Sequence, residues 1–315
     1  MLRLLIVSDI HGSETTWRKL LNAVKLDIWQ VDAILVAGDL AGKGLAPIVR
    51  EDGRWRAEVR GQTRYAHTQD ELATMERQIA DMGIYGVQMV AAEVDNLADP
   101  GILAEQFNRA IYQRLESWVR MAEERVAPKG VPFFVIPGND DPGVVDDALA
   151  TSSYIQNVDR RVAHLPDGRE IVGMAHANPT PWHTPRELPD EDLGTVAEGL
   201  LKQLEHPREA VVMFHCPPYG ISLDEAPKLD EQLRPVMTAT GGLMPVPVGS
   251  MGIRDVIASF QPRLGAHGHI HESGGHASLG RTLCVNAGSE YTAGVLRAYI
   301  VHLDNDRVIP LRAEA

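Results

Sequence analysis

The segment at residues 132–142 constrains the fold more than any other part of the chain. It starts with an apolar run, Phe133–Ile136, whose aromatic and β-branched residues are typical of a strand buried on both faces of a parallel sheet. Pro137 and Gly138 then end the strand, because proline has no N–H to donate and glycine tolerates positive φ. Three polar residues, 139–141, follow directly. In open α/β sheets, ligands bind at the edge formed by the carboxyl ends of the strands. The segment therefore predicts a ligand-binding site at that edge.

Four other apolar runs end in polar residues of the same kind. Residues 4–7 are followed by Asp9 and His11, and residues 33–37 by Asp39. Residues 210–214 are followed by His215, and residues 264–266 by His269 and His271. Helical patterns separate several of these strands, among them residues 17–24, 100–127, 196–204 and 250–260. This alternation predicts right-handed crossovers and a largely parallel inner sheet, to which a hairpin signal at residues 162–174 adds antiparallel strands.

Composition excludes some classes of function. The chain has 315 residues, 44% hydrophobic and 23% charged, as in globular proteins, and no window reaches the ~18 apolar residues of a membrane span. Two cysteines are too few for a disulfide framework and we find no targeting segment, so we expect a cytoplasmic protein that does not bind membranes. The net charge of -13 argues against nonspecific nucleic-acid binding, which needs a basic surface.

Residues 43–98 do not follow the alternation of strands and helices. Residues 50–64 are charged and carry turn residues at Gly53 and Gly61, while Thr68 and Glu71 form a capping-box pattern before a helical stripe. We therefore expect a mainly helical insertion within a single domain of residues 1–315. It either packs as a structural appendage, the interpretation that we favour, or provides a lid or a dimer surface for a homo-oligomer.

The polar side chains at the strand ends have the composition of a metal site. They are carboxylates, a carboxamide and imidazoles: Asp9, His11, Asp39, Asn139, His215, His269 and His271. The pairs Asp9/His11 and His269/His271 are two residues apart, which places both members of a pair on one face of extended backbone. Together these groups can bind two ions that share one carboxylate. Oxygen and nitrogen ligands without thiolate favour Mn, Fe, Zn or Co.

In chain order these groups form the motifs Asp-x-His, Gly-Asp, Gly-Asn-x-Asp, His and Gly-His-x-His. The series resembles the calcineurin-like metallophosphoesterase superfamily over residues 1–42 and 100–300, but not over the insertion. The resemblance implies an α/β fold, a four-layer α/β/β/α sandwich in which helices flank two mixed β-sheets and the site lies at the strand ends.

The resemblance also implies roles for individual residues. Asp39 would bridge two metal ions whose other ligands are Asp9, His11 and His271 on one ion, and Asn139, His215 and His269 on the other. Such ions lie ~3.5–4 Å apart, and a hydroxide that bridges them attacks the phosphorus atom in line. The implied function is metal-dependent hydrolysis of a small-molecule phosphoester.

One position departs from the family motif Gly-Asn-His-Asp/Glu, because Asp140 has the place of the histidine that helps the leaving group depart. Asp140 is either a protonated general acid, a further contact to the metal site or its water, or an exposed turn residue, and we favour the last. Asp141 matches the carboxylate that ordinarily steadies this segment, and these two aspartates are our catalytic candidates. An ionised Asp140 would repel the dianion of a monoester more than a diester, so we expect diesters or activated monoesters to be favoured.

Candidate substrate contacts lie near the motifs. Asn178, Trp182 and His183 are on a proline-rich loop that borders the site in similar bacterial and archaeal proteins, and His267 precedes His269 by two residues. Specificity would lie in the insertion and in the loops at 178–187 and 222–250.

Two other functions are compatible with parts of the pattern. A non-catalytic scaffold or metal-binding protein on the same fold would account for the insertion and for the missing histidine, but it has no need for seven ligands. A binuclear hydrolase of carbon esters or amides would use similar ligands, but the Gly-Asn-x-Asp order argues against it.

Overall fold

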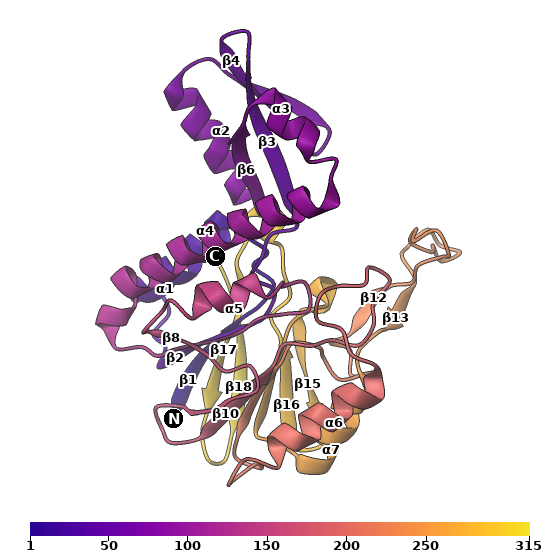
Figure 1. Ribbon diagram of the computed structural model, residues 1–315. Coiled ribbons are helices and arrows are strands. Elements are labelled where there is room, and N and C mark those ends of the chain that lie inside the picture. The colour runs from indigo at the N-terminus through magenta and orange to yellow at the C-terminus, as the bar shows by residue number, and fades with distance from the viewer.

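The computed structural model describes residues 1–315 and has four layers (Figure 1). Two six-stranded sheets pack face to face, and helices cover the outer face of each sheet. Both sheets contain parallel and antiparallel pairs. The predicted α/β/β/α sandwich of mixed sheets is therefore confirmed.

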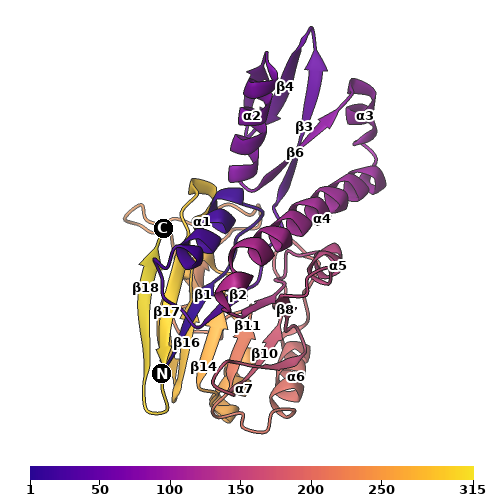
Figure 2. The same cartoon turned by 90° about the vertical axis from the view of Figure 1, so that its left-hand side faces the viewer.

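The first sheet has the strand order β18-β17-β1-β2-β7-β8. Its strands, in this order, are Val308–Glu314, Arg297–Leu303, Leu2–Val7, Ala33–Ala37, Phe133–Ile136 and Ile155–Asn157. β1, β2 and β7 run parallel, so their carboxyl ends meet at one edge of the sheet. Figure 2 shows β17 and β18 at the side of the molecule where both termini lie.

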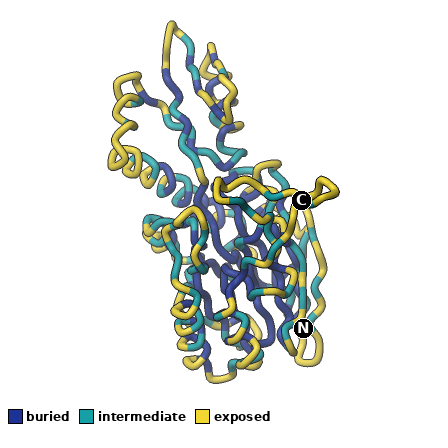
Figure 3. Tube along the Cα trace, turned by 90° about the vertical axis from the view of Figure 1, so that its right-hand side faces the viewer, coloured by how far each residue is buried: buried dark blue, intermediate teal, exposed yellow.

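The second sheet has the order β15-β16-β14-β11-β10-β9. Its strands, in this order, are Gly275–Leu279, Thr282–Asn286, Leu264–His267, Val211–Phe214, Glu170–Met174 and Val162–His164. β10, β11, β14 and β16 are parallel, and β9 pairs with β10 as the predicted antiparallel hairpin. Buried residues are concentrated in these two sheets (Figure 3).

The helices bury their apolar sides on the two sheets. α1 (Glu14–Lys25), α4 (Pro100–Arg125) and α5 (Val144–Leu149) cover the first sheet, and α6 (Asp190–Leu201) and α7 (Met251–Phe260) cover the second. Asp99 caps α4 ahead of Pro100, as its sequence predicts, whereas α1 begins earlier than expected because Ser13 caps it. None of the helices combines the length and the apolar composition that a membrane-spanning segment needs.

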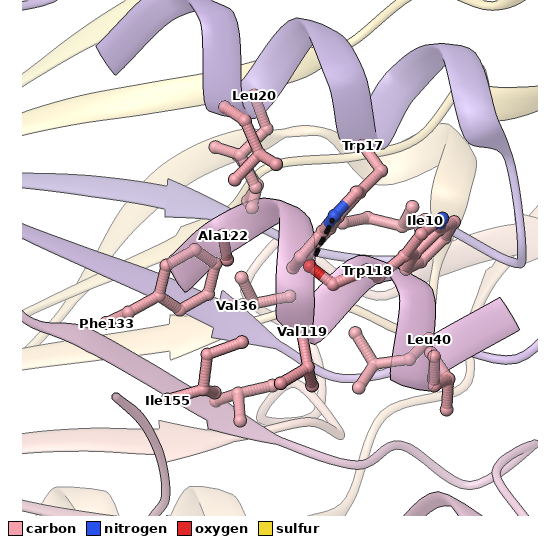
Figure 4. Close-up of a cluster of buried hydrophobic side chains, with 14 of the residues drawn as sticks. Ile10, Trp17, Leu20, Val36, Leu40, Trp118, Val119, Ala122, Phe133 and Ile155 are labelled. Atoms are coloured by element: carbon pink, nitrogen blue, oxygen red, sulfur yellow. Dashed lines mark hydrogen bonds between the residues drawn. The ribbon is translucent and has the colours of Figure 1, made fainter. Parts of the chain in front are cut away.

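A tryptophan pair joins α1 to α4 above the first sheet (Figure 4). The rings of Trp17 and Trp118 stack with centroids 4.8 Å apart, and Trp17 Nε1 donates to the carbonyl oxygen of Trp118. Phe133 of β7 packs against Trp17 from below. This contact packs α1, α4 and β7 against one another.

Residues 43–98 form a lobe that stands apart from the sandwich, above α4 in Figure 1. Its strands form a sheet with the order β5-β4-β3-β6: Gln62–Ala66, Arg54–Val59, Gly44–Glu51 and Ile84–Met89. α2 (Gln69–Asp81), which has the predicted Thr68 cap, packs on this sheet, and α3 (Ala91–Asn96) follows β6. The expectation of a mainly helical insertion is therefore wrong.

The sequence signal for these strands is an alternation with a period of two residues. In β4 the buried Trp55, Ala57 and Val59 alternate with more exposed charged residues. The turn residues Gly53 and Gly61 are in two-residue hairpin turns, Asp52-Gly53 and Arg60-Gly61, in which both residues have positive φ. Charge on the exposed face hid the strand pattern.

The remaining regular segments are short. Strands β12 (Glu225–Pro227) and β13 (Pro245–Pro247) form an antiparallel pair at the base of a projecting arm. Three 3-10 helices cover Ala127–Lys129, His271–Ser273 and Tyr291–Ala293. The last two border the polar edge of the sandwich, where the predicted site residues lie.

Candidate metal centre

The seven predicted ligands all follow the carboxyl ends of parallel strands. Asp9 and His11 follow β1, Asp39 follows β2, and Asn139 follows β7 in the first sheet. His215 follows β11, and His269 and His271 follow β14 in the second sheet. The site therefore lies where the polar edges of the two packed sheets meet.

Four of these residues form one cluster. One ligand atom from each of Asp9, His11, Asp39 and His271 lies within 4.8 Å of all the others. His11 Nε2 is 2.9 Å from His271 Nε2, and His271 Nε2 is 3.5 Å from Asp9 Oδ1. His11 Nδ1 is 3.3 Å from the carbonyl oxygen of Ala41, which accepts its proton and leaves the Nε2 lone pair facing the cluster.

The other three residues form a second group around one amide oxygen. Asn139 Oδ1 is 3.0 Å from His215 Nε2 and 2.7 Å from His269 Nδ1. His215 Nδ1 is 2.7 Å from the carbonyl oxygen of Ala37, which fixes the ring with its Nε2 toward Asn139. Asn139 Nδ2 donates to Thr184 Oγ1 at 2.9 Å, which fixes the amide with its oxygen toward the histidines.

Asp39 lies between the two groups. Its Oδ2 is 3.5 Å from His11 Nε2 and 3.4 Å from His215 Nε2. Its Oδ1 accepts a hydrogen bond from the backbone N–H of Asp140 at 3.0 Å, which fixes the carboxylate plane. One oxygen thus faces both sets of ligands, the arrangement that a bridging carboxylate requires.

The residues present fit a pair of metal ions. Asp9 Oδ2 is buried and has no hydrogen-bond partner, although a buried carboxylate oxygen without one is costly. His215 Nε2 and His269 Nδ1 converge on Asn139 Oδ1 at 3.0 and 2.7 Å, so three further potential ligand atoms lie together. A cation among these atoms would satisfy all of them, and the mixed oxygen and nitrogen donor set suits Mn, Fe, Zn or Co. The number and the identity of the ions remain predictions.

The backbone that carries the ligands is not extended, so our spacing argument was wrong. Asp9, His11, Asp39 and His269 all have positive φ, between 45° and 70°. Left-handed turns after the strands, not a shared face of extended chain, bring Asp9 and His11 together. His269 and His271 are separated by their turn and face different groups. Non-glycine residues in this strained region are concentrated at functional sites.

Three glycines make room for the ligands. A Cβ atom on Gly38 would lie 2.2 Å from His215 Nδ1, and one on Gly138 would lie 2.1 Å from Asp39 Oδ1. A Cβ on Gly268 would lie 2.6 Å from Asp9 Oδ2. Each of these glycines directly precedes a ligand in the sequence, so the pattern Gly-ligand has a steric cause.

The protonation states suit metal binding. Burial opposes ionisation of Asp39, but His215 and His11 hold its pKa well below its usual range. Burial lowers the pKa of His11 to about 3 and that of His269 to about 4, so both rings are neutral. Burial also works against charge on His215, yet Asp39 raises its pKa to about 10. The carboxylates are anions and the rings of His11 and His269 have free lone pairs, as metal ligation requires, whereas His215 must release a proton before it can bind an ion.

Asp141 positions the loops and does not face the ligands. Its carboxylate accepts hydrogen bonds from the backbone N–H groups of Gly138, Leu40 and Ala41 at 2.8, 3.0 and 2.7 Å. It thereby joins the loop after β7 to the loop after β2. Burial and the charge of Asp39 raise its pKa to about 7, and the three N–H donors oppose this shift. Asp141 is thus a positioning residue.

Asp140 lies at the edge of the cluster and is paired with a lysine that we did not select from the sequence. Its Oδ2 is 2.6 Å from Lys43 Nζ and 4.0 Å from His11 Nδ1. Burial and Asp39 raise the pKa of Asp140, while Lys43 lowers it. Because its side chain is only 19% exposed and ion-paired, Asp140 is not the free turn residue that we favoured. Lys43 follows Asp39 by four residues but begins the insertion, where we did not look for site residues.

The four substrate candidates have varied surroundings. Trp182 and His183 are exposed on their loop. Asn178 accepts a hydrogen bond from Cys216 Sγ and donates to the carbonyl oxygen of Val248, so its amide links three segments. His267 is buried, with Nδ1 2.7 Å from the carbonyl oxygen of Phe214 and Nε2 toward Gly265. No hydrogen bond joins any of them to the seven ligands.

Thr184 and Tyr291 are further residues that the sequence analysis missed. Thr184 belongs to the proline-rich loop and orients the Asn139 amide. The ring of Tyr291 packs 4.8 Å from that of His11 and 6.0 Å from that of His271. No motif marks either residue, because each is placed by a loop that is distant in the sequence.

The fold and the ligand cluster define a class: an α/β/β/α sandwich protein with a candidate metal centre at its strand ends. Comparison with known proteins agrees, because the family model for calcineurin-like phosphoesterases matches residues 2–82. The resemblance inferred from the motifs is thus confirmed. The matched segment includes Asp9, His11 and Asp39, while the other four ligands lie beyond it.

Similar proteins add information about the fold. The uncharacterized protein MJ1162 of Methanocaldococcus jannaschii is 32% identical over 153 residues, which are 48% of this chain and only 61% of that relative. One crystal structure covers 98% of both chains with a TM-score of 0.59 at 18% identity. The crystal structure of TT1561 of Thermus thermophilus covers 94% of this chain and 93% of its own, with a TM-score of 0.52 at 14% identity. At these identities the two structures support the fold alone.

Proposed function

We propose that this protein is a metal-dependent phosphoesterase with a two-ion centre. The observation that carries the proposal is the position of Asp39 Oδ2, at 3.5 and 3.4 Å from imidazole nitrogens of two separate ligand groups. The family model for calcineurin-like phosphoesterases supports the same reaction class. The proposed ligands are Asp9, His11 and His271 for one ion and Asn139, His215 and His269 for the other, with Asp39 shared.

The chain's own residues preorganise such a centre. Asp39, Asp9 and the neutral His11 and His269 present lone pairs at fixed positions before any ion binds. Hydrogen bonds from His11 and His215 to backbone carbonyl groups fix the tautomers. Bound ions of this kind polarise phosphoryl oxygens and lower the pKa of coordinated water. Asp141 keeps the two loops that carry Asp39 and Asn139 in register.

We propose small-molecule diesters or activated monoesters as substrates, although the reason differs from the one inferred from the sequence. Lys43 balances the charge of Asp140, so repulsion of a dianionic monoester is weaker than we expected. The remaining reason is that position 140 has no imidazole to protonate a poor leaving group. If this is right, Asp140→His should improve alkyl monoester hydrolysis more than aryl diester hydrolysis. Equal losses on both substrates would contradict it.

The test of the proposed function combines metal content with hydrolysis. Metal-free protein is reconstituted separately with Mn, Fe, Zn and Co, and elemental analysis should find up to two ions per chain. The loaded protein should hydrolyse an aryl diester or an aryl monoester, and a chelator should abolish this activity. Protein that binds no metal would overturn the proposal. Protein that binds two ions but turns over neither substrate would favour the non-catalytic alternative.

Other aspects of the protein remain proposals. The net charge of -13 favours a small-molecule substrate over a nucleic-acid polymer. Cys216 and Cys284 are buried free thiols, which suits the cytoplasmic location that we propose. A homo-oligomer formed through residues 43–98 is still a prediction, to be checked by the mass of the protein in solution.

A further inference from the structure

Lys43 is a cation held at the edge of the candidate metal centre. Its Nζ lies 2.6 Å from Asp140 Oδ2, and the same oxygen is 4.0 Å from His11 Nδ1. The backbone N–H of Asp140 in turn donates to Asp39 Oδ1, the oxygen next to the proposed bridging atom. The ammonium group is therefore connected to the centre through a single residue.

The base of the lobe fixes the backbone of Lys43. The preceding residue, Gly42, donates its N–H to Tyr85 Oη at 2.8 Å. A Cβ on Gly42 would lie 2.2 Å from the carbonyl oxygen of Gly83, and a Cβ on Gly83 would lie 2.2 Å from that of His11. The start of the lobe thus packs on the turn after α2, and that turn packs directly against the loop that carries His11. This packing fixes the position of the Lys43 backbone beside the ligands, so the lobe contributes a residue to the site.

The neighbouring arginines are committed to structural contacts. Arg114 donates to the carbonyl oxygen of Gly12, and Arg186 donates to those of Asp141 and Pro142. Lys43 instead pairs with a carboxylate at the centre, and its side chain remains 48% exposed. An accessible cation at this edge can contact a bound substrate, because five of the seven ligands beneath it are buried and the other two, His269 and His271, are only partly exposed.

We propose that Lys43 is a catalytic residue, whose ammonium group contacts the leaving-group oxygen of the phosphoester and neutralises the negative charge that develops there. This inference rests on the proposed phosphoesterase function. Asp140 serves as the positioning residue that aims the ammonium group. Lys43 is half-exposed at the solvent side of the cluster, so a leaving group that extends from the ions toward solvent at this edge comes into its reach.

The atoms, electron pairs and protons of the reaction balance without a proton transfer from Lys43. Water supplies the oxygen of the new P–O bond, and the P–O bond to the leaving group breaks with its electron pair on the leaving oxygen. One water proton is released to solvent, and the leaving oxygen takes a proton from solvent, so the products are an alcohol and a phosphate with one ester link fewer. Lys43 remains charged throughout, and removing such a fixed charge typically costs about 10²–10³ in turnover.

The experiment compares Lys43→Met with Lys129→Met in metal-loaded protein. Lys129 forms a matched ion pair with Asp27, also at 2.6 Å, but far from the ligands in the fold, at the ends of α4 and α1. Both variants and wild type are assayed on methyl aryl phosphodiesters whose phenols have increasing pKa. We expect Lys43→Met to lose about 10-fold on the best leaving group and about 10²–10³-fold on the poorest. Lys43→Arg should restore part of the loss, and Lys129→Met should match wild type.

A second readout does not depend on turnover. Binding of inorganic phosphate to metal-loaded protein is measured by calorimetry, with metal content checked in each variant. Lys43→Met should bind phosphate about 10-fold more weakly with unchanged metal content, a loss typical of one charge-assisted contact. A loss of activity that is equal for all leaving groups, with wild-type phosphate affinity, would overturn the role of Lys43. Inactive wild-type protein with Lys43-dependent phosphate binding would overturn the proposed function and the catalytic step, and would leave Lys43 as an anion-binding residue.

Discussion

The glycines that precede the ligands determine the geometry of the centre as much as the ligands do. Gly38, Gly138 and Gly268 lack the Cβ atom that would overlap His215, Asp39 and Asp9. Only Gly38 also has a positive φ, so at the other two positions the requirement is space. A methyl group at Gly138 would have to displace the proposed bridging carboxylate.

Gly138→Ala should therefore reduce metal binding and activity while the fold persists. The added Cβ would lie 2.1 Å from Asp39 Oδ1, and a shift of about 1 Å in a site can cost about 10²-fold in rate. Elemental analysis and kcat/KM measure the effect. Gly143→Ala is the matched control, because a Cβ on Gly143 meets nothing within 4 Å. Wild-type metal content in Gly138→Ala would show that the loop adapts and that this steric argument fails.

Asp39→Asn should be the most damaging change of a single ligand. Its Oδ2 faces both ligand groups, so the substitution weakens both ion positions and removes a negative charge. We expect a loss in kcat/KM of more than about 10²-fold, beyond the 10–100-fold typical of residues that only support ligands. Asp32→Asn is the control, since Asp32 lies at the other end of β2 and pairs with Arg3. Wild-type turnover in Asp39→Asn would exclude a bridging role.

At the scale of elements, the α1–α4 contact determines how the helical layer lies on the first sheet. Trp118 is 1% exposed, and its Nε1 donates to Glu14 Oε2 at 2.7 Å. The two aromatic rings lie nearly parallel, with an interplanar angle of 8°. Their stacking adds stabilisation to that from the burial of Trp118.

Trp118→Ala should destabilise the protein by about 3–5 kcal/mol, the usual cost of removing a fully buried tryptophan. Trp182→Ala is the control, because Trp182 is 66% exposed and its removal should change the free energy of unfolding little. Denaturant midpoints of the two variants and wild type give the comparison. A midpoint for Trp118→Ala within error of wild type would mean that the helical layer does not contribute to the measured unfolding transition.

The lobe shows how elements are misassigned when charge conceals periodicity. The helix with the Thr68 cap could be predicted, because its cap and its stripe are local signals. The strands could not be recognised as easily, since β3 ends in the charged Arg50 and Glu51 and charged residues alternate with buried ones along β4. The turns Asp52-Gly53 and Arg60-Gly61 were the signals that should have indicated hairpins.

At the scale of the whole molecule, the candidate metal centre lies where the two sheets meet. Four ligands come from strand ends of the first sheet and three from the second. Ions bound by these residues would therefore stabilise the packed sandwich relative to the unfolded chain, which has no preformed site. Saturation of one site at about 100 times its Kd contributes about 2.7 kcal/mol.

Thermal unfolding should reflect this linkage. Metal-free protein should melt at a lower temperature than protein loaded with Mn or Zn, and a chelator should reverse the shift. In Asp39→Asn the shift should be much smaller at the same metal concentration, because both ion positions share that residue. Equal metal-induced shifts in wild type and Asp39→Asn would indicate that the ions bind elsewhere.

The sequence by itself indicated the layers of this protein, through the resemblance of its motifs, and the candidate ligands. Buried strands such as Phe133–Ile136 are local apolar runs, and the residue that ends each of them is adjacent in the chain, so both can be recognised without tertiary information. The order of the motifs then indicates the resemblance that the family model confirms. The helix caps at Asp99 and Thr68 are local hydrogen bonds and were equally predictable.

Only the tertiary structure decided what surrounds the ligands. The pairing of Asp140 with Lys43 joins residues 97 positions apart in the sequence, and nothing local to either residue indicates it. The division of His269 and His271 between two ligand groups depends on a left-handed turn and on partners in both sheets. Apolar periodicity and helix caps depend on neighbours in the chain, whereas charge pairing and ligand direction depend on the distances between folded segments.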